Sequence, residues 1–290
     1  MTNSRSKTMV LMDATGSMGH LLNQVKYTIC TMFDRAIDIL TEYGFSSDSF
    51  EIQLAVYRDY DSLKNVLQTN EWERKPLNLR NFMNNIKANG GADYAEAIEI
   101  ELWHVNQEIK RFKSGDGVSQ VILIGDAPAK SIDSVKEYRK RFGGENFWSK
   151  TKFKVPTFYI DELNLLKESE VPVHAFFVEN GPEECFSEIA RITGGQTGFL
   201  DVNSSDGSDK LIDLITPLIL GNIETINGNP GNQLSNIFFL LNLELDLRAR
   251  FEPLYIHIAK IFNSSSNSTK DENFSFKAIL VDMIKVVEKR

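Results

Sequence analysis

Apolar side chains recur along this chain with two different periods. Continuous apolar runs at residues 9–13 and within 118–128 each lead into an aspartate. Runs of this kind are typical of strands that are buried on both faces of a parallel sheet. Apolar residues at helical spacing over 21–43 predict a long amphipathic helix, for which Gly44 is a suitable C-terminal cap. The pattern therefore predicts strands that alternate with helices.

The same alternation continues through the first 222 residues. Further strands are predicted at 50–59, within 62–71, at 171–178 and at 195–202. Further helices are predicted at 77–86, at 95–112, on either side of 147–158, at 182–193 and at 208–220. This order favours an α/β fold with a doubly wound, mostly parallel open sheet flanked by helices, which is a Rossmann-like architecture.

The pattern changes after about residue 222. Asparagine, glycine and proline at 227–232 are typical of a turn or linker. Two apolar-periodic stretches follow, at 234–262 and 274–287. We therefore predict an α/β domain at 1–222 and a helical C-terminal extension at 223–290.

Composition and charge narrow the classes of partner. Hydrophobic residues make up 42% of the chain and charged residues 25%, which are ordinary values for a globular protein. The formal net charge of -8 disfavours nonspecific binding to nucleic acid or to anionic membranes. The sequence shows neither a signal peptide nor a membrane-spanning segment, and Cys30 and Cys185 form no CxxC pair. We expect a cytoplasmic protein with two reduced thiols.

Candidate chemistry lies directly after the first predicted strand. Asp13, Thr15 and Ser17 place a carboxylate and two hydroxyls at every second position, and Gly16 helps the backbone to turn tightly. In an open α/β sheet, the carboxyl ends of the strands form the ligand crevice. Oxygen donors of this kind suit Mg²⁺, with Mn²⁺ as a second candidate. The alternative is that one of the hydroxyls only caps the following helix.

Three segments together resemble the von Willebrand factor type A domain. DATGSM, which starts at Asp13, resembles the DxSxS motif of that family, with Thr15 at the middle hydroxyl position. NGGAD at 89–93 is similar to its GGTD-type loop, and IGDAP at 124–128 to its strand-end aspartate segment. The resemblance extends over residues 7–222. With YRDYD included, it is closest to the subgroup associated with alpha-kinases, although no kinase signature is visible.

The resemblance implies a metal-ion-dependent adhesion site. It makes Asp13 the anchoring carboxylate, Thr15 and Ser17 direct hydroxyl ligands, and Asp126 the distant carboxylate. The family's loop threonine falls at Ala92, which has no side-chain donor. Either the adjacent Asp93 or a water would then take that position.

The leading functional hypothesis is a metal-dependent protein-interaction module without catalytic residues. An aspartate or glutamate of a protein partner would complete the coordination of the ion, as the resemblance implies. One alternative is a Mg²⁺-dependent phosphoryl-transfer enzyme, because DATGS resembles the DxDxT motif of haloacid-dehalogenase-like phosphatases. Thr15, however, replaces the acid/base carboxylate of that motif. A metal-free scaffold is a further alternative, and the sequence leaves the oligomeric state open.

Asp59 ends the second predicted strand and has two interpretations. Its carboxylate could orient a metal-bound water from the outer shell, since it belongs to the same edge of the sheet as Asp13. It could equally form an ion pair with Arg58 or cap the turn that follows.

Overall fold

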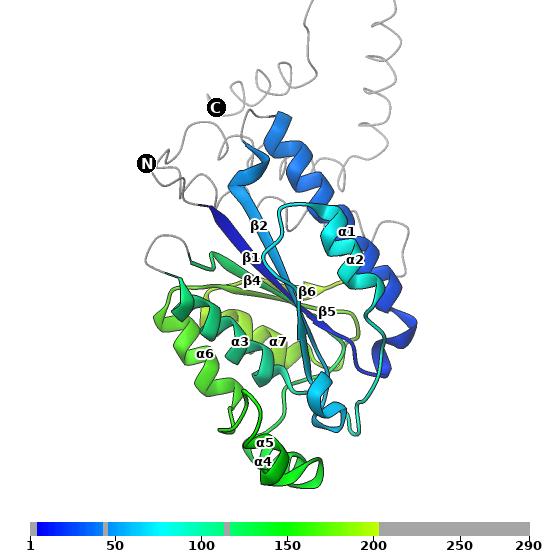
Figure 1. Ribbon diagram of the computed structural model, residues 1–290, viewed down its shortest axis with the longest axis vertical. Coiled ribbons are helices and arrows are strands. Elements are labelled where there is room, and N and C mark those ends of the chain that lie inside the picture. The colour runs from blue at the N-terminus through cyan, green and yellow to red at the C-terminus, as the bar shows by residue number, and fades with distance from the viewer. Residues whose placement is uncertain (1–4, 43–45, 113–116, 203–290) are drawn as a thin grey trace, which may run out of the picture. The chain divides into compact units, whose positions relative to one another are not determined.

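The computed structural model describes residues 5–42, 46–112 and 117–202, which form a six-stranded sheet in the order β3-β2-β1-β4-β5-β6 (Figure 1). All neighbouring strands are parallel except β2 and β3. The predicted α/β class with a mostly parallel sheet is thereby confirmed. The strands are β1 Ser6–Asp13, β2 Phe50–Tyr57, β3 Leu67–Thr69, β4 Gln120–Gly125, β5 Val173–Phe177 and β6 Thr197–Phe199.

Strand β1 lies in the middle of the sheet and is buried along its whole length. Val10 and Met12 belong to the core on one face of the sheet, whereas Met9 and Leu11 belong to the core on the other. Side chains of a strand alternate between the two faces, so a strand covered on both sides needs apolar residues at successive positions. This explains the continuous apolar run in the sequence.

Helices cover both faces of the sheet (Figure 1). Helices α1 and α2 share a core with one face, while α3, α6 and α7 share a core with the other. Trp148 of α5 and Tyr138 of α4 also belong to this second core. The helices are α1 Leu22–Glu42, α2 Pro76–Asn84, α3 Ile98–Arg111, α4 Ile132–Arg141, α5 Gly144–Trp148, α6 Tyr159–Glu168 and α7 Glu183–Thr193.

The predicted elements agree with this arrangement in kind and in order. Two segments differ in detail. Residues 62–65 belong to a 3-10 turn, Tyr60–Asn65, and only Leu67–Thr69 form the short antiparallel β3. Helix α3 begins at Ile98, because residues 89–97 are not helical. The predicted helix at 208–220, the boundary after 222 and the C-terminal extension lie outside the described residues. Within the described ranges, no helix is both long and apolar enough to cross a membrane.

The strand order reverses direction between β1 and β4. From β1 the chain moves outward to β2 and β3, and it then returns to place β4 on the other side of β1. The connections at the carboxyl ends of β1 and β4 therefore diverge, which opens a crevice at this point of the sheet. Asp13 is the last residue of β1, and Asp126 directly follows the last residue of β4.

The core under α1 should be sensitive to loss of volume. Phe33 is completely buried, and its ring packs edge to face with Phe50 at a centroid distance of 5.6 Å. We expect Phe33→Ala to lower the free energy of unfolding by about 3–5 kcal/mol, measured by urea denaturation. Leu77→Ala is the control because Leu77 is 63% exposed, and it should change this free energy by less than about 0.5 kcal/mol. Equal effects of the two substitutions would contradict the packing described.

Candidate functional site

The loop after β1 is organised by the carboxylate of Asp13. Asp13 is completely buried, and its Oδ1 accepts hydrogen bonds from the backbone N–H and the Oγ1 of Thr15, both at 2.8 Å. Thr15 Oγ1 also lies 3.0 Å from Ser17 Oγ. The 3-10 turn Ser17–His20 has Gly16 as its N-cap and no side-chain capping bond. Helix capping therefore does not explain these hydroxyls, which instead form a chain with the aspartate.

A second loop is joined to the first by backbone hydrogen bonds. The N–H of Gly16 donates to the carbonyl of Gly90, and the N–H of Asn89 donates to the carbonyl of Ala14, both at 3.0 Å. Gly90 and Gly91 have φ values of +82° and +91°, a region that favours glycine. The two loops thus form one connected backbone unit at the end of β1.

Gly91 also leaves space that a side chain would fill. A Cβ atom built on Gly91 would lie 3.1 Å from Glu96 Oε1 and 3.4 Å from Thr15 Cβ. The missing side chain therefore keeps the backbone of this loop close to the Thr15 and Glu96 side chains.

A third loop, after β4, contributes Asp126. The preceding Gly125 fits because a Cβ there would approach the Tyr57 hydroxyl to 2.7 Å and Asp13 Cβ to 3.4 Å. Asp126 is buried, and its Oδ1 has no hydrogen-bond partner among the described residues. The same holds for Asp13 Oδ2. Two neighbouring strands therefore each present a buried carboxylate with an unsatisfied oxygen.

These loops surround a cavity of about 120 Å³. Of the predicted site residues, Ser17, Asp93 and Asp126 line it directly. Asp13 and Thr15 belong to the same cluster through the hydrogen bonds to one another and to Ser17. The other residues lining the cavity are Gly91, Tyr94, Glu96 and Ala127.

Asp93 lines the cavity and also has an ion-pair partner, Lys130, that the sequence does not indicate. Lys130 is almost completely buried, and its ammonium forms ion pairs with Asp93 and with Asp59, the latter at 3.1 Å. It also donates to the carbonyl of Ala95 and lies 3.9 Å from the centre of the Tyr138 ring. Asp93 therefore shares its charge between Lys130 and the cavity.

Asp59 caps a turn, as one of its two interpretations holds. Its Oδ1 accepts a hydrogen bond of 2.8 Å from the N–H of Tyr60, the first residue of the 3-10 turn. The other option of that interpretation, an ion pair with Arg58, is not what the structure shows, because Asp59 pairs with Lys130 and Arg58 donates to Gln68 and to nearby carbonyls.

Glu96 is a cavity residue that the sequence reasoning missed. Its backbone N–H donates to the carbonyl of Pro128 at 2.8 Å, and its backbone carbonyl accepts from the backbone N–H of Lys130 at 3.2 Å. These two bonds join this loop to the loop after β4. Its side chain is buried, and Oε2 has no hydrogen-bond partner among the described residues. The available signal was its position in YAEA, directly after the glycine loop. Tyr94, from the same segment, is 59% exposed at the cavity.

The buried carboxyl groups of this site are difficult to ionise. Burial, and next the charge of Asp126, raises the pKa of Asp13 to about 8. Burial, and next the charges of Asp13 and Asp59, raises the pKa of Glu96 to about 11. Both pKa shifts have the same main cause, which is burial of the carboxyl group in a region of low dielectric constant, and neighbouring negative charge adds to it.

The donor set has the chemistry of a site for a hard cation. Its side chains supply carboxylate and hydroxyl oxygens, which Mg²⁺ and Mn²⁺ prefer over the soft metals. Across residues 5–42, 46–112 and 117–202, no group of three or more His, Cys, Asp or Glu side chains is placed to hold a metal. An ion here would depend on the two hydroxyls and on water in addition to the carboxylates.

Comparison with known proteins supports the fold but assigns no family. No protein-family model and no curated protein sequence matches the chain. Among solved structures, it is similar to the pilus adhesin SpaC from Lactobacillus rhamnosus GG in its open conformation, with a TM-score of 0.52 and 12% identity. The match covers 78% of this chain but only 31% of that adhesin. At this identity the likeness concerns the fold alone.

The raised pKa of Asp13 predicts a particular dependence of stability on pH. The folded state holds this proton up to about pH 8, whereas the unfolded chain releases it near the ordinary aspartate pKa of 3.8. Without divalent metal, wild-type stability should therefore fall as pH rises from about 4 to about 8. Asp13→Asn should remove this part of the fall and be the more stable protein at about pH 9, by a few kcal/mol.

Urea denaturation in chelator at about pH 5 and about pH 9 measures this difference. Asp133→Asn is the matched control, because the side chain of Asp133 is 97% exposed. A difference between wild type and Asp13→Asn that does not change with pH would contradict the burial of a protonated Asp13.

Proposed function

We propose that this chain is a metal-dependent protein-interaction module that resembles the von Willebrand factor type A domain. It binds Mg²⁺, or Mn²⁺, in the cavity at the ends of β1 and β4. The observation that supports this most directly is the pair of buried, unsatisfied oxygens on Asp13 and Asp126. A buried polar atom without a partner is costly, and a bound cation would remove that cost at both residues together.

The proposed ligand set follows from the positions of the side chains. Ser17 and Asp126 line the cavity, and Asp13 and Thr15, which join Ser17 in one chain of hydrogen bonds, would bind the ion directly or through water. Asp93 also lines the cavity and is ion-paired with Lys130 through its Oδ1, so we assign it a weaker role in the ligand set. A divalent cation would supply positive charge where burial and mutual repulsion raise the pKa of Asp13, and thus favour the ionised carboxylates.

The partner would present an aspartate or glutamate side chain. The cavity volume of about 120 Å³ leaves room for water beside an ion. A carboxylate can replace such a water and form a directional, charge-assisted contact. The exposed ring of Tyr94 at the cavity offers an aromatic surface for the residues around that carboxylate. The fold likeness to a pilus adhesin agrees with a binding role.

Metal binding should stabilise the folded state. We expect Mg²⁺ or Mn²⁺ to raise the melting temperature of the chelator-stripped full chain in a saturable way. A hundredfold excess over Kd corresponds to about 2.7 kcal/mol. Asp13→Ala and Asp126→Ala should abolish the response, whereas Asp133→Ala, at an exposed position outside the cavity, should retain it.

Differential scanning calorimetry with each metal measures the response. If no shift occurs at millimolar metal, or if all three variants respond like wild type, the proposed metal site is wrong. A metal-free scaffold would then be the better description.

The acidic partner can be tested without knowing its identity. We expect a random peptide library selected on the Mg²⁺-loaded full chain to be enriched in peptides that share one aspartate or glutamate. Bound peptides should elute with chelator. Replacing the shared acid by its amide should weaken binding by at least tenfold, because a charged contact is worth about 1.5–3 kcal/mol. Selection of peptides without an acid, or binding that persists in chelator, would contradict metal-mediated recognition.

A further inference from the structure

Glu96 lines the cavity at the ends of β1 and β4, but the proposed ligand set gives it no role. Its side chain is only 2% exposed, and its Oε2 has no hydrogen-bond partner among the described residues. A buried carboxyl oxygen without a partner costs free energy. Because Glu96 lines the cavity, a group bound in the cavity is the natural source of the missing hydrogen-bond donor.

The backbone of Glu96 is fixed against the loop that carries Asp126. The N–H of Glu96 donates to the carbonyl of Pro128 at 2.8 Å, and the carbonyl of Glu96 accepts from the N–H of Lys130 at 3.2 Å. These bonds belong to a parallel bridge between Glu96 and Ala129. The Glu96 carboxyl group therefore needs no movement of the loop to meet a ligand at the end of β4.

The glycine loop makes room for the Glu96 carboxyl group. A Cβ atom at Gly91 would lie 3.1 Å from Glu96 Oε1, which is closer than ordinary van der Waals contact. The two residues after Gly91 offer an ion little direct coordination, because Ala92 has no side-chain donor and Asp93 is ion-paired with Lys130. We therefore expect water to occupy coordination positions on this side of the cavity.

A water on a divalent ion needs acceptors for its hydrogens. Mg²⁺ requires near-ideal octahedral coordination and usually keeps several waters. In a buried cavity, the hydrogens of such a water must be accepted by protein groups. Burial, and next the charge of Asp13, raises the pKa of Glu96, and Asp126 adds to this effect, so Glu96 lies within electrostatic reach of both proposed ligands. A carboxyl group can accept a hydrogen bond whether or not it is ionised.

We propose that Glu96 is a positioning residue of the metal site and accepts a hydrogen bond from a water on the bound ion. This inference rests on the proposed metal binding. Contact through water agrees with the structure, because no group of three or more His, Cys, Asp or Glu side chains in the described part of the chain is placed to hold a metal. The role requires an acceptor atom at position 96 and not a negative charge, which separates it from the role of a direct ligand.

Two substitutions of similar length and shape test the need for an acceptor. Glu96→Gln keeps a carboxamide oxygen, whereas Glu96→Met has only a weakly accepting thioether. Isothermal titration calorimetry of the chelator-stripped full chain with Mn²⁺ measures Kd. We expect Glu96→Met to weaken binding by about 10–100-fold and Glu96→Gln to bind about as tightly as wild type. Glu137→Met, at an exposed position on α4, is the control and should also bind like wild type.

The residence time of water on the ion is a second readout, which a purely structural role of Glu96 would leave unchanged. It is measured by ¹⁷O relaxation of water at saturating Mn²⁺. Loss of the acceptor should shorten the residence time in Glu96→Met, and Glu96→Gln should resemble wild type. Both variants should fold, because each removes a buried carboxyl group whose Oε2 has no partner. Urea denaturation in chelator checks this.

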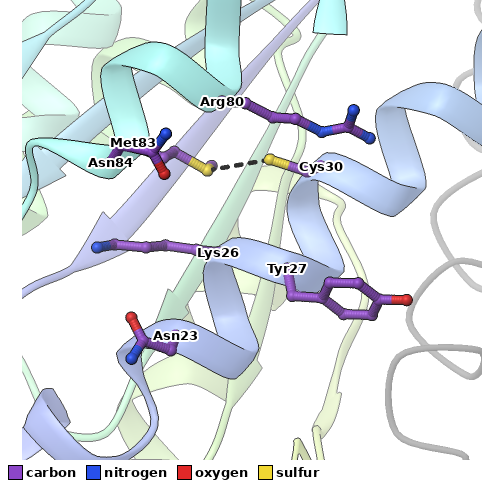
Figure 2. A pocket seen from close by; sticks show the side chains of 7 residues that line it. All are labelled: Asn23, Lys26, Tyr27, Cys30, Arg80, Met83 and Asn84. Atoms are coloured by element: carbon purple, nitrogen blue, oxygen red, sulfur yellow. Dashed lines mark hydrogen bonds between the residues drawn. The ribbon is translucent and has the colours of Figure 1, made fainter. Parts of the chain in front are cut away.

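A second cavity is not expected to take up the ion. It has a volume of about 360 Å³ and lies between α1 and α2, and Figure 2 shows the side chains that line it. Lys26 and Arg80 are among them, whereas aspartate and glutamate are not. Positive charge without a carboxylate disfavours a cation. Binding of Mn²⁺ therefore reports on the cavity at the ends of β1 and β4.

The possible results separate the role of Glu96 from the metal site itself. If wild type binds Mn²⁺ but the Gln and Met variants share one Kd and one water residence time, the role of Glu96 is wrong and the metal site stands. An equal loss of affinity in both variants has the same meaning, because the negative charge would then be what matters. If wild type binds no Mn²⁺, both the metal site and the role of Glu96 are wrong.

Discussion

The burial of the Asp13 carboxylate is the constraint on which the rest of the candidate site depends. A carboxylate at this depth must have its oxygens satisfied or its charge neutralised. Thr15 satisfies one oxygen with two hydrogen bonds, which shapes the loop and brings the Thr15 and Ser17 hydroxyls together. The other oxygen is left without a partner among the described residues. A positive charge at the point where the sheet reverses its strand order would therefore stabilise the ionised carboxylate of Asp13.

Much of the fold could be predicted because its strands are sandwiched between two helical layers. This arrangement requires apolar side chains at successive positions of β1 and β4, and such runs are easily recognised in a sequence. A strand was predicted within 62–71, but the bounds and the antiparallel pairing of β3 did not follow from an apolar run. Strand β3 has only three residues at the edge of the sheet, and its pairing depends on the turn before it, in which Leu63 adopts a positive φ.

The candidate site could be predicted only where it follows directly from strand ends. Asp13 and Asp126 end neighbouring parallel strands, so topology alone places them at one edge of the sheet. The pairing of Lys130 with Asp93 and Asp59 depends instead on where three separate loops meet, which no local pattern encodes. Glu96 was missed for a similar reason, since its approach to the cavity relies on backbone bonds to residues more than 30 positions away.

The backbone bonds between the loop after β1 and the glycine loop have a consequence for the kinetics of ligand exchange. Gly16 with Gly90, and Asn89 with Ala14, connect segments that would otherwise move independently. The entropy of ordering these loops is therefore lost during folding and not when a ligand arrives. An ion bound as we propose would enter a cavity formed in advance, so loss of water from the ion, and not loop closure, would set its rate of entry.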